Sequence, residues 1–193
     1  MMLAGKFRPV RSTGWGMQDV WRAMEGCQAA GLTKAIGVSN FNVQLLNDML
    51  CYAHIPPAVN QVERHPYHAQ PKLMEFCARW GIAVTGYAPL GAPGLYGKNA
   101  TDKLLQNDVL TGIASKYHKT PAQVVIRWAI DTGTITIPKS SKPQRIVENM
   151  NVFDFELTEE ELATIATLDK NGQGRLFHQD WHGVPSFEFA ANL

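Results

Sequence analysis

Short apolar runs, each followed by a segment with helical periodicity, recur four times, and this repeat constrains the fold more than any other feature of the sequence. The runs lie at residues 35–38, 58–62, 82–87 and 134–137. Runs of this length that end at polar or turn-forming residues are typical of buried strands. Parallel strands need a long connection, usually a helix that crosses over with a right-handed sense. We therefore expect a parallel α/β fold.

The segments around these runs carry helix start and stop signals. We expect helices at residues 15–30, around 43–50, at 71–80, and near 107–118, 121–131, 143–150 and 159–168. Pro71 and Pro121 suit the first turn of a helix, whose leading N–H groups have no partner within the helix. Thr158 and Glu161 form a capping-box pattern. From Asn171 onward the pattern is typical of loop.

Periodicity leaves two architectures open, a doubly wound sheet and part of a (β/α)8 barrel. A closed barrel has eight strands and typically about 250 residues. With 193 residues and four expected strands, this chain corresponds to half of such a barrel.

The composition restricts the kind of partner. Lys and Arg number 18 and Asp and Glu 17, so the net charge of +1 gives no broad field to attract nucleic acid or an anionic membrane. No apolar run approaches the ~20 residues of a membrane span, and residues 1–11 lack the apolar middle of a signal peptide. We therefore expect a cytoplasmic protein that forms a single domain over residues 1–193.

Several familiar site motifs are absent or incomplete. Gly91, Gly94 and Gly97 follow neither the dinucleotide nor the Walker glycine spacing. Residues 37–41 lack the second glycine of a hydrolase nucleophile elbow. The six histidines show no helical metal-ligand spacing, and we expect the three cysteines to be buried thiols. Metal catalysis and triad hydrolysis are therefore disfavoured.

Polar side chains gather where the four apolar runs end. They are Ser39, Asn40, Gln61, Glu63, Tyr87, Lys139 and Ser140. In parallel α/β folds the ligand site lies at the carboxyl ends of the strands. Each residue also has a structural explanation, such as capping of the next helix by Ser39 or packing of Tyr87 in the core. Together they favour a ligand-binding rim, while the structural explanation stays open.

Residues 138–145 have the composition of an anion site. They follow the last expected strand and open a helix, whose N-terminal N–H groups attract anions. Ser140 and Ser141 can donate hydrogen bonds. Lys139 adds a positive charge, and Arg145 adds a bidentate fork. The alternative is a solvated basic turn, although (β/α)8 barrels often bind phosphate after their last strands.

Four motifs in order carry a family resemblance. They are Ala35-Ile36-Gly37-Val38-Ser39-Asn40-Phe41, Asn60-Gln61-Val62-Glu63-Arg64-His65-Pro66, Gly86-Tyr87-Ala88-Pro89-Leu90-Gly91 and Ile137-Pro138-Lys139-Ser140. In this order and spacing they resemble the aldo-keto reductase family, from about Trp15 to the C-terminus. The resemblance implies a (β/α)8 TIM barrel in which the four expected strands are the fifth to the eighth.

The resemblance also implies a site for the cofactor NADPH. Ser39, Asn40 and Gln61 match the family positions that hydrogen-bond the nicotinamide carboxamide. Tyr87 matches the aromatic residue on which the nicotinamide ring stacks, and Leu90 lies in the segment over the pyrophosphate.

The same resemblance assigns the adenosine end of NADPH to the basic segment and the helix after it. Lys139, Ser140 and Arg145 match the residues that hold the 2′-phosphate, which implies a preference for NADPH over NADH. Glu148 and Asn149 match contacts to the adenine.

The activity that the resemblance implies is reduction of a small aldehyde or ketone by hydride transfer from NADPH, with a proton donated by a Tyr beside a Lys. The family's catalytic Asp, Tyr, Lys and His belong to the first four strands, so we expect no catalytic residue within these 193 residues. We expect the isolated chain to be inactive and marginally stable, and its open strand edges to favour self-association.

The C-terminal tail and the overall role leave further alternatives. Tails at this place in the family form a wall of the substrate pocket, which makes Trp181 the candidate substrate residue, with plain packing as the alternative. A protein that binds NADPH without catalysis, as a sensor or scaffold, is the second functional interpretation. A doubly wound phosphate-binding protein outside the family is the third.

Overall fold

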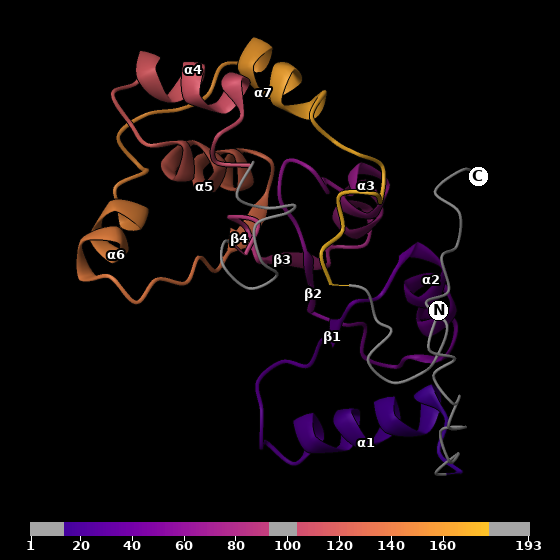
Figure 1. The fold of residues 1–193 in the computed structure, drawn as a ribbon. Coiled ribbons are helices and arrows are strands. Elements are labelled where there is room, and N and C mark those ends of the chain that lie inside the picture. The colour runs from indigo at the N-terminus through magenta and orange to yellow at the C-terminus, as the bar shows by residue number, and fades with distance from the viewer. Residues whose placement is uncertain (1–13, 93–103, 178–193) are drawn as a thin grey trace, which may run out of the picture.

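The structure, a computed structural model, describes residues 14–92 and 104–177 (Figure 1). Its elements are α1 (Met17–Ala29), β1 (Val38–Ser39), α2 (Val43–Tyr52), β2 (Val59–Glu63), α3 (Pro71–Arg79), β3 (Ala83–Tyr87), α4 (Asp108–Lys116), α5 (Pro121–Asp131), β4 (Thr134–Thr136), α6 (Pro143–Met150) and α7 (Glu159–Ala166). All the expected strands and helices are present. β1 is shorter and starts later than expected, and the other boundaries agree within two residues.

The strands pair in the order β1-β2-β3-β4, and every pair is parallel. A doubly wound sheet reverses its strand order at a switch point, so this unbroken order excludes that alternative. Right-handed crossovers between successive neighbours place the helices on one face of the sheet. Figure 1 shows the helices following one another around the strands in an open arc, from α1 through α3 to α6. The fold is therefore four consecutive βα units of the (β/α)8 barrel class, as the sequence predicts.

The two faces of the sheet differ in chemistry. Val62 and Val84 face the helices and share a buried cluster with Leu46 of α2. Because side chains alternate along a strand, Gln61 lies on the opposite face. Ser39 pairs with Gln61 in register and lies on that face beside it. Ser39 and Gln61 thus share the face that the helices leave uncovered.

A second core joins α4, α5 and α7. Leu110, Val124 and Ile165, one from each helix, are fully buried in a single cluster. The capping box that starts α7 is present as expected, because Thr158 Oγ1 accepts from the N–H of Glu161 and Glu161 Oε2 accepts from the N–H of Thr158. This core fixes α5, which packs on β4 and α6 and so supports the segment between them.

The expectation of three buried cysteines is wrong in part. Cys77 is buried, whereas Cys27 is half-buried and Cys51 is exposed. The buried side of α2 is marked by Leu46 and Met49. Cys51 comes two residues after Met49, which is more than half a helical turn around the axis, so it faces solvent.

Across residues 14–92 and 104–177, no helix is both long enough and apolar enough to cross a membrane. The same residues contain no cluster of three His, Cys, Asp or Glu side chains placed to hold a metal ion.

Candidate functional site

Hydrogen bonds join the ends of β1, β2 and β3. The Ser39 hydroxyl donates to the carbonyl of Gln61 at 2.8 Å, and the backbone N–H of Asn40 donates to the same carbonyl at 2.9 Å. The Tyr87 hydroxyl donates to Asn40 Oδ1 at 3.0 Å. The structure therefore brings together all four residues that the resemblance assigns to the nicotinamide end of the cofactor.

Two of these strand ends turn through left-handed backbone. Asn40 has a φ of 60°, and Ala88, directly after Tyr87, has a φ of 49°. Asparagine adopts this region more readily than most residues, but alanine does so at a cost of roughly 1 kcal/mol or more. Such backbone outliers concentrate at ligand sites, where the surrounding contacts hold them. Their positions at the ends of β1 and β3 match the rim expected from the sequence.

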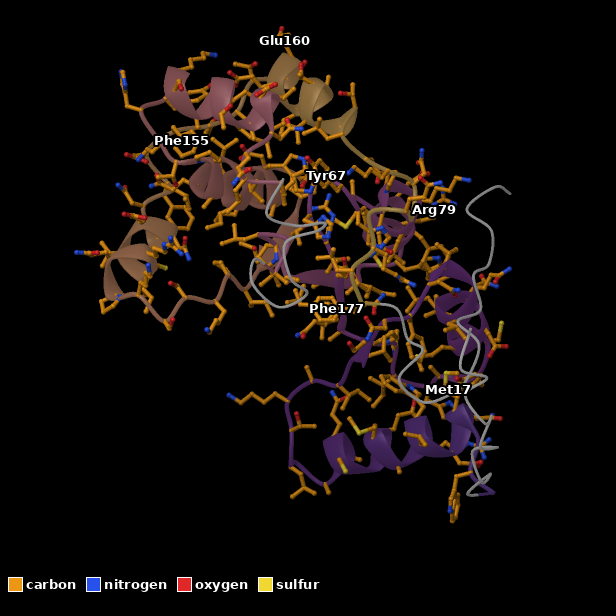
Figure 2. All side chains as sticks on the ribbon, viewed as in Figure 1. Met17, Tyr67, Arg79, Phe155, Glu160 and Phe177 are labelled. Carbon is orange, nitrogen blue, oxygen red and sulfur yellow. The ribbon has the colours of Figure 1, made fainter. Side chains whose placement is uncertain are left out.

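The ring of Tyr87 is half-buried and has an aromatic neighbour. The ring of Phe177 meets it edge-on, with the two centroids 5.4 Å apart and an interplanar angle of 81°. In Figure 2, Phe177 lies where the C-terminal segment reaches the strands near the centre of the molecule.

A cavity of about 520 Å³ lies beyond β3 and β4. It is lined by six of the ten residues expected to bind the cofactor, namely Leu90, Lys139, Ser140, Arg145, Glu148 and Asn149. The start of α5 and the two residues 105–106 complete its lining. A cavity of this size is within the range of small-molecule sites.

The end of the cavity at α6 favours an anion. α6 begins after Lys142 without a side-chain cap, so the first N–H groups of the helix keep their donor capacity. The hydroxyl oxygen of Ser140 accepts from the N–H of Lys142 at 3.1 Å and thereby fixes the turn before the helix. Among the described residues, neither Lys139 nor Arg145 forms an ion pair with a carboxylate. Their positive charges are therefore available to a ligand.

α5 holds α6 in place behind this cavity. The side-chain amide of Gln123 donates to the carbonyl of Glu148 at 3.1 Å and to the carbonyl of Asn151 at 2.9 Å. Gln123 is itself buried, so these bonds lie away from water. The backbone of Glu148 is thus fixed while its side chain stays exposed at the cavity.

Glu63 has a role that the sequence did not reveal. Its carboxylate is 1 % exposed and accepts hydrogen bonds from His65 and from the backbone N–H groups of Leu176 and Phe177. Burial by itself raises the pKa of the Glu63 carboxyl, but the hydrogen bonds from His65, Phe177 and Leu176 outweigh it and lower the pKa below its ordinary value. Glu63 therefore stays charged and anchors the C-terminal segment. The sequence placed it at the rim but gave no sign of a partner more than a hundred residues away.

Trp181, the candidate substrate residue, lies outside the described residues.

The four parallel βα units define a class of protein, the barrel-type α/β proteins, in which phosphate is often bound after the last strands. Comparison with known proteins identifies the family within that class. The model of the Aldo/keto reductase family matches residues 7–170, and the chain belongs to this family.

Individual relatives agree with this assignment. The chain is 50 % identical over 155 residues to Aldose reductase B of Dictyostelium discoideum, covering 80 % of this chain and 48 % of that protein. It is 44 % identical over 176 residues to the NAD(P)H-dependent D-xylose reductase of Candida tenuis, covering 88 % of this chain and 54 % of that protein. The chain thus spans about half the length of these curated relatives.

A solved structure confirms the fold. The Bombyx mori aldo-keto reductase in complex with NADP is 36 % identical, with a TM-score of 0.80, and the match covers 88 % of this chain and 55 % of that one. The expected family and the (β/α)8 fold are therefore both confirmed.

Proposed function

We propose that this chain binds NADPH across the carboxyl ends of β1 to β4 and, as part of an aldo-keto reductase, serves the reduction of a small aldehyde or ketone to an alcohol by hydride transfer. The observation that carries this proposal is the cavity where Lys139, Ser140 and Arg145 meet the uncapped start of α6. NADPH differs from NADH by a 2′-phosphate, which is an anion suited to such a place. Two relatives support the cofactor, since one solved structure holds NADP and the Candida tenuis enzyme is named for NAD(P)H.

At the nicotinamide end, the strand-end residues would hold the carboxamide and the ring. A carboxamide both donates and accepts hydrogen bonds, and the exposed side-chain amides of Asn40 and Gln61 offer both functions. The Ser39 hydroxyl donates to the carbonyl of Gln61 and keeps a lone pair for the carboxamide N–H. The nicotinamide ring would stack on Tyr87, which orients the carbon that donates the hydride.

The remaining contacts are assigned to the cavity. We assign the pyrophosphate to Leu90, the 2′-phosphate to Lys139, Ser140 and Arg145, and the adenine to Glu148 and Asn149. The carboxylate of Glu148 suits the amino group of adenine, which donates hydrogen bonds. The carboxylate would repel a phosphate placed beside it. The positive charges of Lys139 and Arg145 and the negative charge of Glu148 therefore specify the orientation of the nucleotide.

Hydride transfer also needs a proton donor on the carbonyl oxygen. Tyr117 lies next to Lys116, with its hydroxyl 3.5 Å from Lys116 Nζ, but both residues lie at the end of α4 beside α7. A hydrogen bond to the Glu161 carboxylate raises the pKa of Tyr117, which is the opposite of what a proton donor needs. The described residues therefore supply cofactor binding, and we expect no turnover of NADPH with a reactive aldehyde by the purified 193-residue chain. Turnover at the rate of a typical reductase would contradict this expectation.

A protein that binds NADPH without catalysis is the second candidate, and it shares the same cofactor site. It is favoured for the isolated chain because the pKa of Tyr117, which lies beside Lys116, is raised, and because the ammonium group of Lys170 lies over the face of the Tyr67 ring, 3.9 Å from its centroid. NADPH binding without turnover by this chain agrees with both candidates, turnover removes the second candidate, and failure to bind NADPH removes both.

The cofactor proposal is tested by fluorescence titration of the chain with NADPH and NADH. We compare Arg145→Ala with Lys142→Ala, which removes the same charge at the start of α6 but from a residue that does not line the cavity. Hydrogen bonds to charged groups contribute about 1.5–3 kcal/mol, so Arg145→Ala should weaken NADPH binding roughly 10- to 100-fold. Binding of NADH should not change, and Lys142→Ala should have a much smaller effect on NADPH.

Equal affinity of the unaltered chain for NADPH and NADH would contradict the proposal. An equal loss in Lys142→Ala and Arg145→Ala would show a general charge effect in place of a phosphate contact.

We also propose that residues 1–193 form one domain, that the protein is cytoplasmic, and that the chain self-associates through its strand edges. Within the described residues, β1 and β4 each pair with a strand on one side. Limited proteolysis tests whether residues 1–193 form one domain, and cell fractionation tests whether the protein is cytoplasmic. Sedimentation equilibrium tests whether the chain self-associates.

A further inference from the structure

We propose that Glu63 is a positioning residue, which fastens the segment of residues 169–177 across the strand ends and so sets the ring of Tyr87 for the nicotinamide. This inference rests on the proposed binding of NADPH and adds a residue that the family resemblance did not assign. The starting observation is a buried carboxylate at the end of β2 whose oxygens accept from the backbone of a distant segment.

The contacts of Glu63 amount to a two-point clamp. Its Oε1 accepts from the N–H of Leu176 at 2.7 Å, and its Oε2 accepts from the N–H of Phe177 at 3.0 Å. His65 Nε2 lies 2.9 Å from the same Oε1, and the side chains of both Glu63 and His65 are 1 % exposed. A buried carboxylate is stable only when its oxygens are hydrogen-bonded. Two successive N–H groups held by two oxygens fix both the position and the direction of the chain.

The rest of the segment is fitted to the loop after β2. The N–H of Lys170 donates to the carbonyl of Tyr67 at 3.1 Å, and its ammonium group lies 3.9 Å from the centroid of the Tyr67 ring. The Asp169 carboxylate accepts from the N–H of Ala69 at 3.3 Å. A Cβ atom on Gly174 would overlap the Tyr67 carbonyl, so this close approach requires glycine. Figure 2 shows Tyr67 and Phe177 along the path of this segment.

The Glu63 clamp places the ring of Phe177 against the ring of Tyr87. Two of the contacts that Tyr87 makes constrain different parts of its side chain: its hydroxyl donates to Asn40, and its ring meets that of Phe177 at 81°. The hydroxyl contact fixes one point and still permits rotation of the ring about its long axis. The edge-on contact with Phe177 opposes that rotation. Glu63 therefore acts on the ring plane through Phe177 and without touching the cofactor.

The test compares three variants in the full 193-residue chain. Glu63→Gln keeps the shape of the side chain but replaces one acceptor oxygen with an amide donor. Phe177→Leu removes the aromatic edge and leaves the clamp intact. Gln173→Ala, an exposed position in the same segment, is the control. The ligands are NADPH and 2′,5′-ADP, which carries the 2′-phosphate and adenine but no nicotinamide.

We expect Glu63→Gln and Phe177→Leu each to weaken NADPH binding about two- to tenfold, as loss of an aromatic edge contact implies, and to leave binding of 2′,5′-ADP unchanged. In amide hydrogen exchange, the N–H groups of Leu176 and Phe177 should lose protection in Glu63→Gln and keep it in Phe177→Leu. Gln173→Ala should change neither the binding of NADPH nor the protection of these two N–H groups.

Equal weakening of NADPH and 2′,5′-ADP in Glu63→Gln would overturn the proposal, because it would show a merely structural role. Unchanged NADPH binding in Phe177→Leu would overturn it as well. If the unaltered chain binds neither ligand, the NADPH proposal fails. The clamp is then tested separately by the NMR resonances of the Tyr87 ring protons. They should shift in both Glu63→Gln and Phe177→Leu, and unshifted resonances would overturn the clamp itself.

Discussion

The side chain of Tyr87 combines a hydroxyl that donates to Asn40 with a ring proposed to carry the nicotinamide. Substitution separates these parts, because Tyr87→Phe removes the hydroxyl and Tyr87→Leu removes the ring. Stacking of a base on an aromatic ring contributes about 1–3 kcal/mol, so we expect Tyr87→Leu to weaken NADPH binding by about 5- to 100-fold in the titration. Tyr87→Phe should cost much less. A loss in Tyr87→Phe as large as that in Tyr87→Leu would mean that the ring does not carry the nicotinamide.

His68 is a second residue with a measurable individual effect. It is buried, and no described residue pairs with its Nε2. Burial is the main cause that lowers the pKa of His68 to about 4; Arg175 and His65 lower it further, while Glu63 and Asp169 oppose the shift. The folded protein therefore holds His68 neutral at a pH where the unfolded chain takes up a proton.

The sign of the resulting pH dependence follows from linkage. A group with a lowered pKa binds more protons in the unfolded state, so stability falls as the pH drops from about 6.5 towards 4. Between pH 7.5 and pH 5 we expect a loss of about 2 kcal/mol from His68 alone. Urea unfolding of the chain and of His68→Gln at several pH values measures this, and the variant should show the smaller loss. If the free energy of unfolding depends on pH identically in both proteins, the loss does not come from His68.

At the scale of the elements, the contact between β1 and β2 depends on Gly37. A Cβ atom there would lie 2.6 Å from the carbonyl oxygen of Val59 and would also overlap the Val59 side chain. Gly37→Ala should therefore push β1 away from β2 and destabilise the protein by about 1–3 kcal/mol, as overpacking does. It should also weaken NADPH binding, because Ser39 and Asn40 follow directly on β1.

Gly112→Ala is the matched control for this prediction. Gly112 lies in α4, where an added Cβ atom meets nothing within 4 Å, and alanine in a helix is favoured over glycine by about 1 kcal/mol. Thermal unfolding should show a lower midpoint for Gly37→Ala and an unchanged or higher one for Gly112→Ala. Equal midpoints for the two variants would indicate that the chain before β1 accommodates a side chain at residue 37.

The sequence predicts the elements well because their signals are local. Pro121 and the periodicity after it locate α5 to the residue, and Thr158 with Glu161 locates the start of α7. β1 is the exception, since residues 35–37 form an apolar run but only Val38–Ser39 pairs as a strand. β1 has a single neighbouring strand among the described residues, so fewer ladder bonds extend it than extend β2.

The site is predictable where its residues sit at strand ends and unpredictable where distant segments meet. Lys139 and Arg145 stand out because charge and a helix start coincide in a short stretch. The bonds from Leu176 and Phe177 to Glu63 join residues 113 and 114 positions apart, and no local pattern signals such a pair. Tertiary packing alone creates this part of the site.

At the scale of the whole molecule, the open arc leaves apolar surface exposed. On β4, Ile135 is 56 % exposed, and it pairs in register with Thr85 on the face that the helices leave uncovered. A sheet with an open edge and an apolar face tends to pair with another chain. We therefore expect the average mass of the chain in sedimentation equilibrium to rise with concentration.

A charge placed on this face should suppress the association. Ile135→Lys introduces a buried charge at any such contact, whereas Gln18→Lys adds the same charge at an exposed position on α1. We expect Ile135→Lys to shift the protein towards monomer and Gln18→Lys to leave it unchanged. A monomeric unaltered chain at all concentrations would contradict self-association.

The binding of NADPH across the strand ends is tested most directly by chemical-shift mapping of the isotope-labelled chain with NADPH and with NADH. With NADPH, we expect shifts in two groups of residues: Ser39, Asn40, Gln61 and Tyr87 at one end, and Lys139, Ser140 and Arg145 at the other. With NADH at matched occupancy, the first group should shift in the same way and the second should shift less. Shifts confined to one end, or identical shifts at Arg145 with both cofactors, would contradict the proposal. In that proposal, one NADPH site extends from the nicotinamide-binding residues at the strand ends to the cavity at the start of α6.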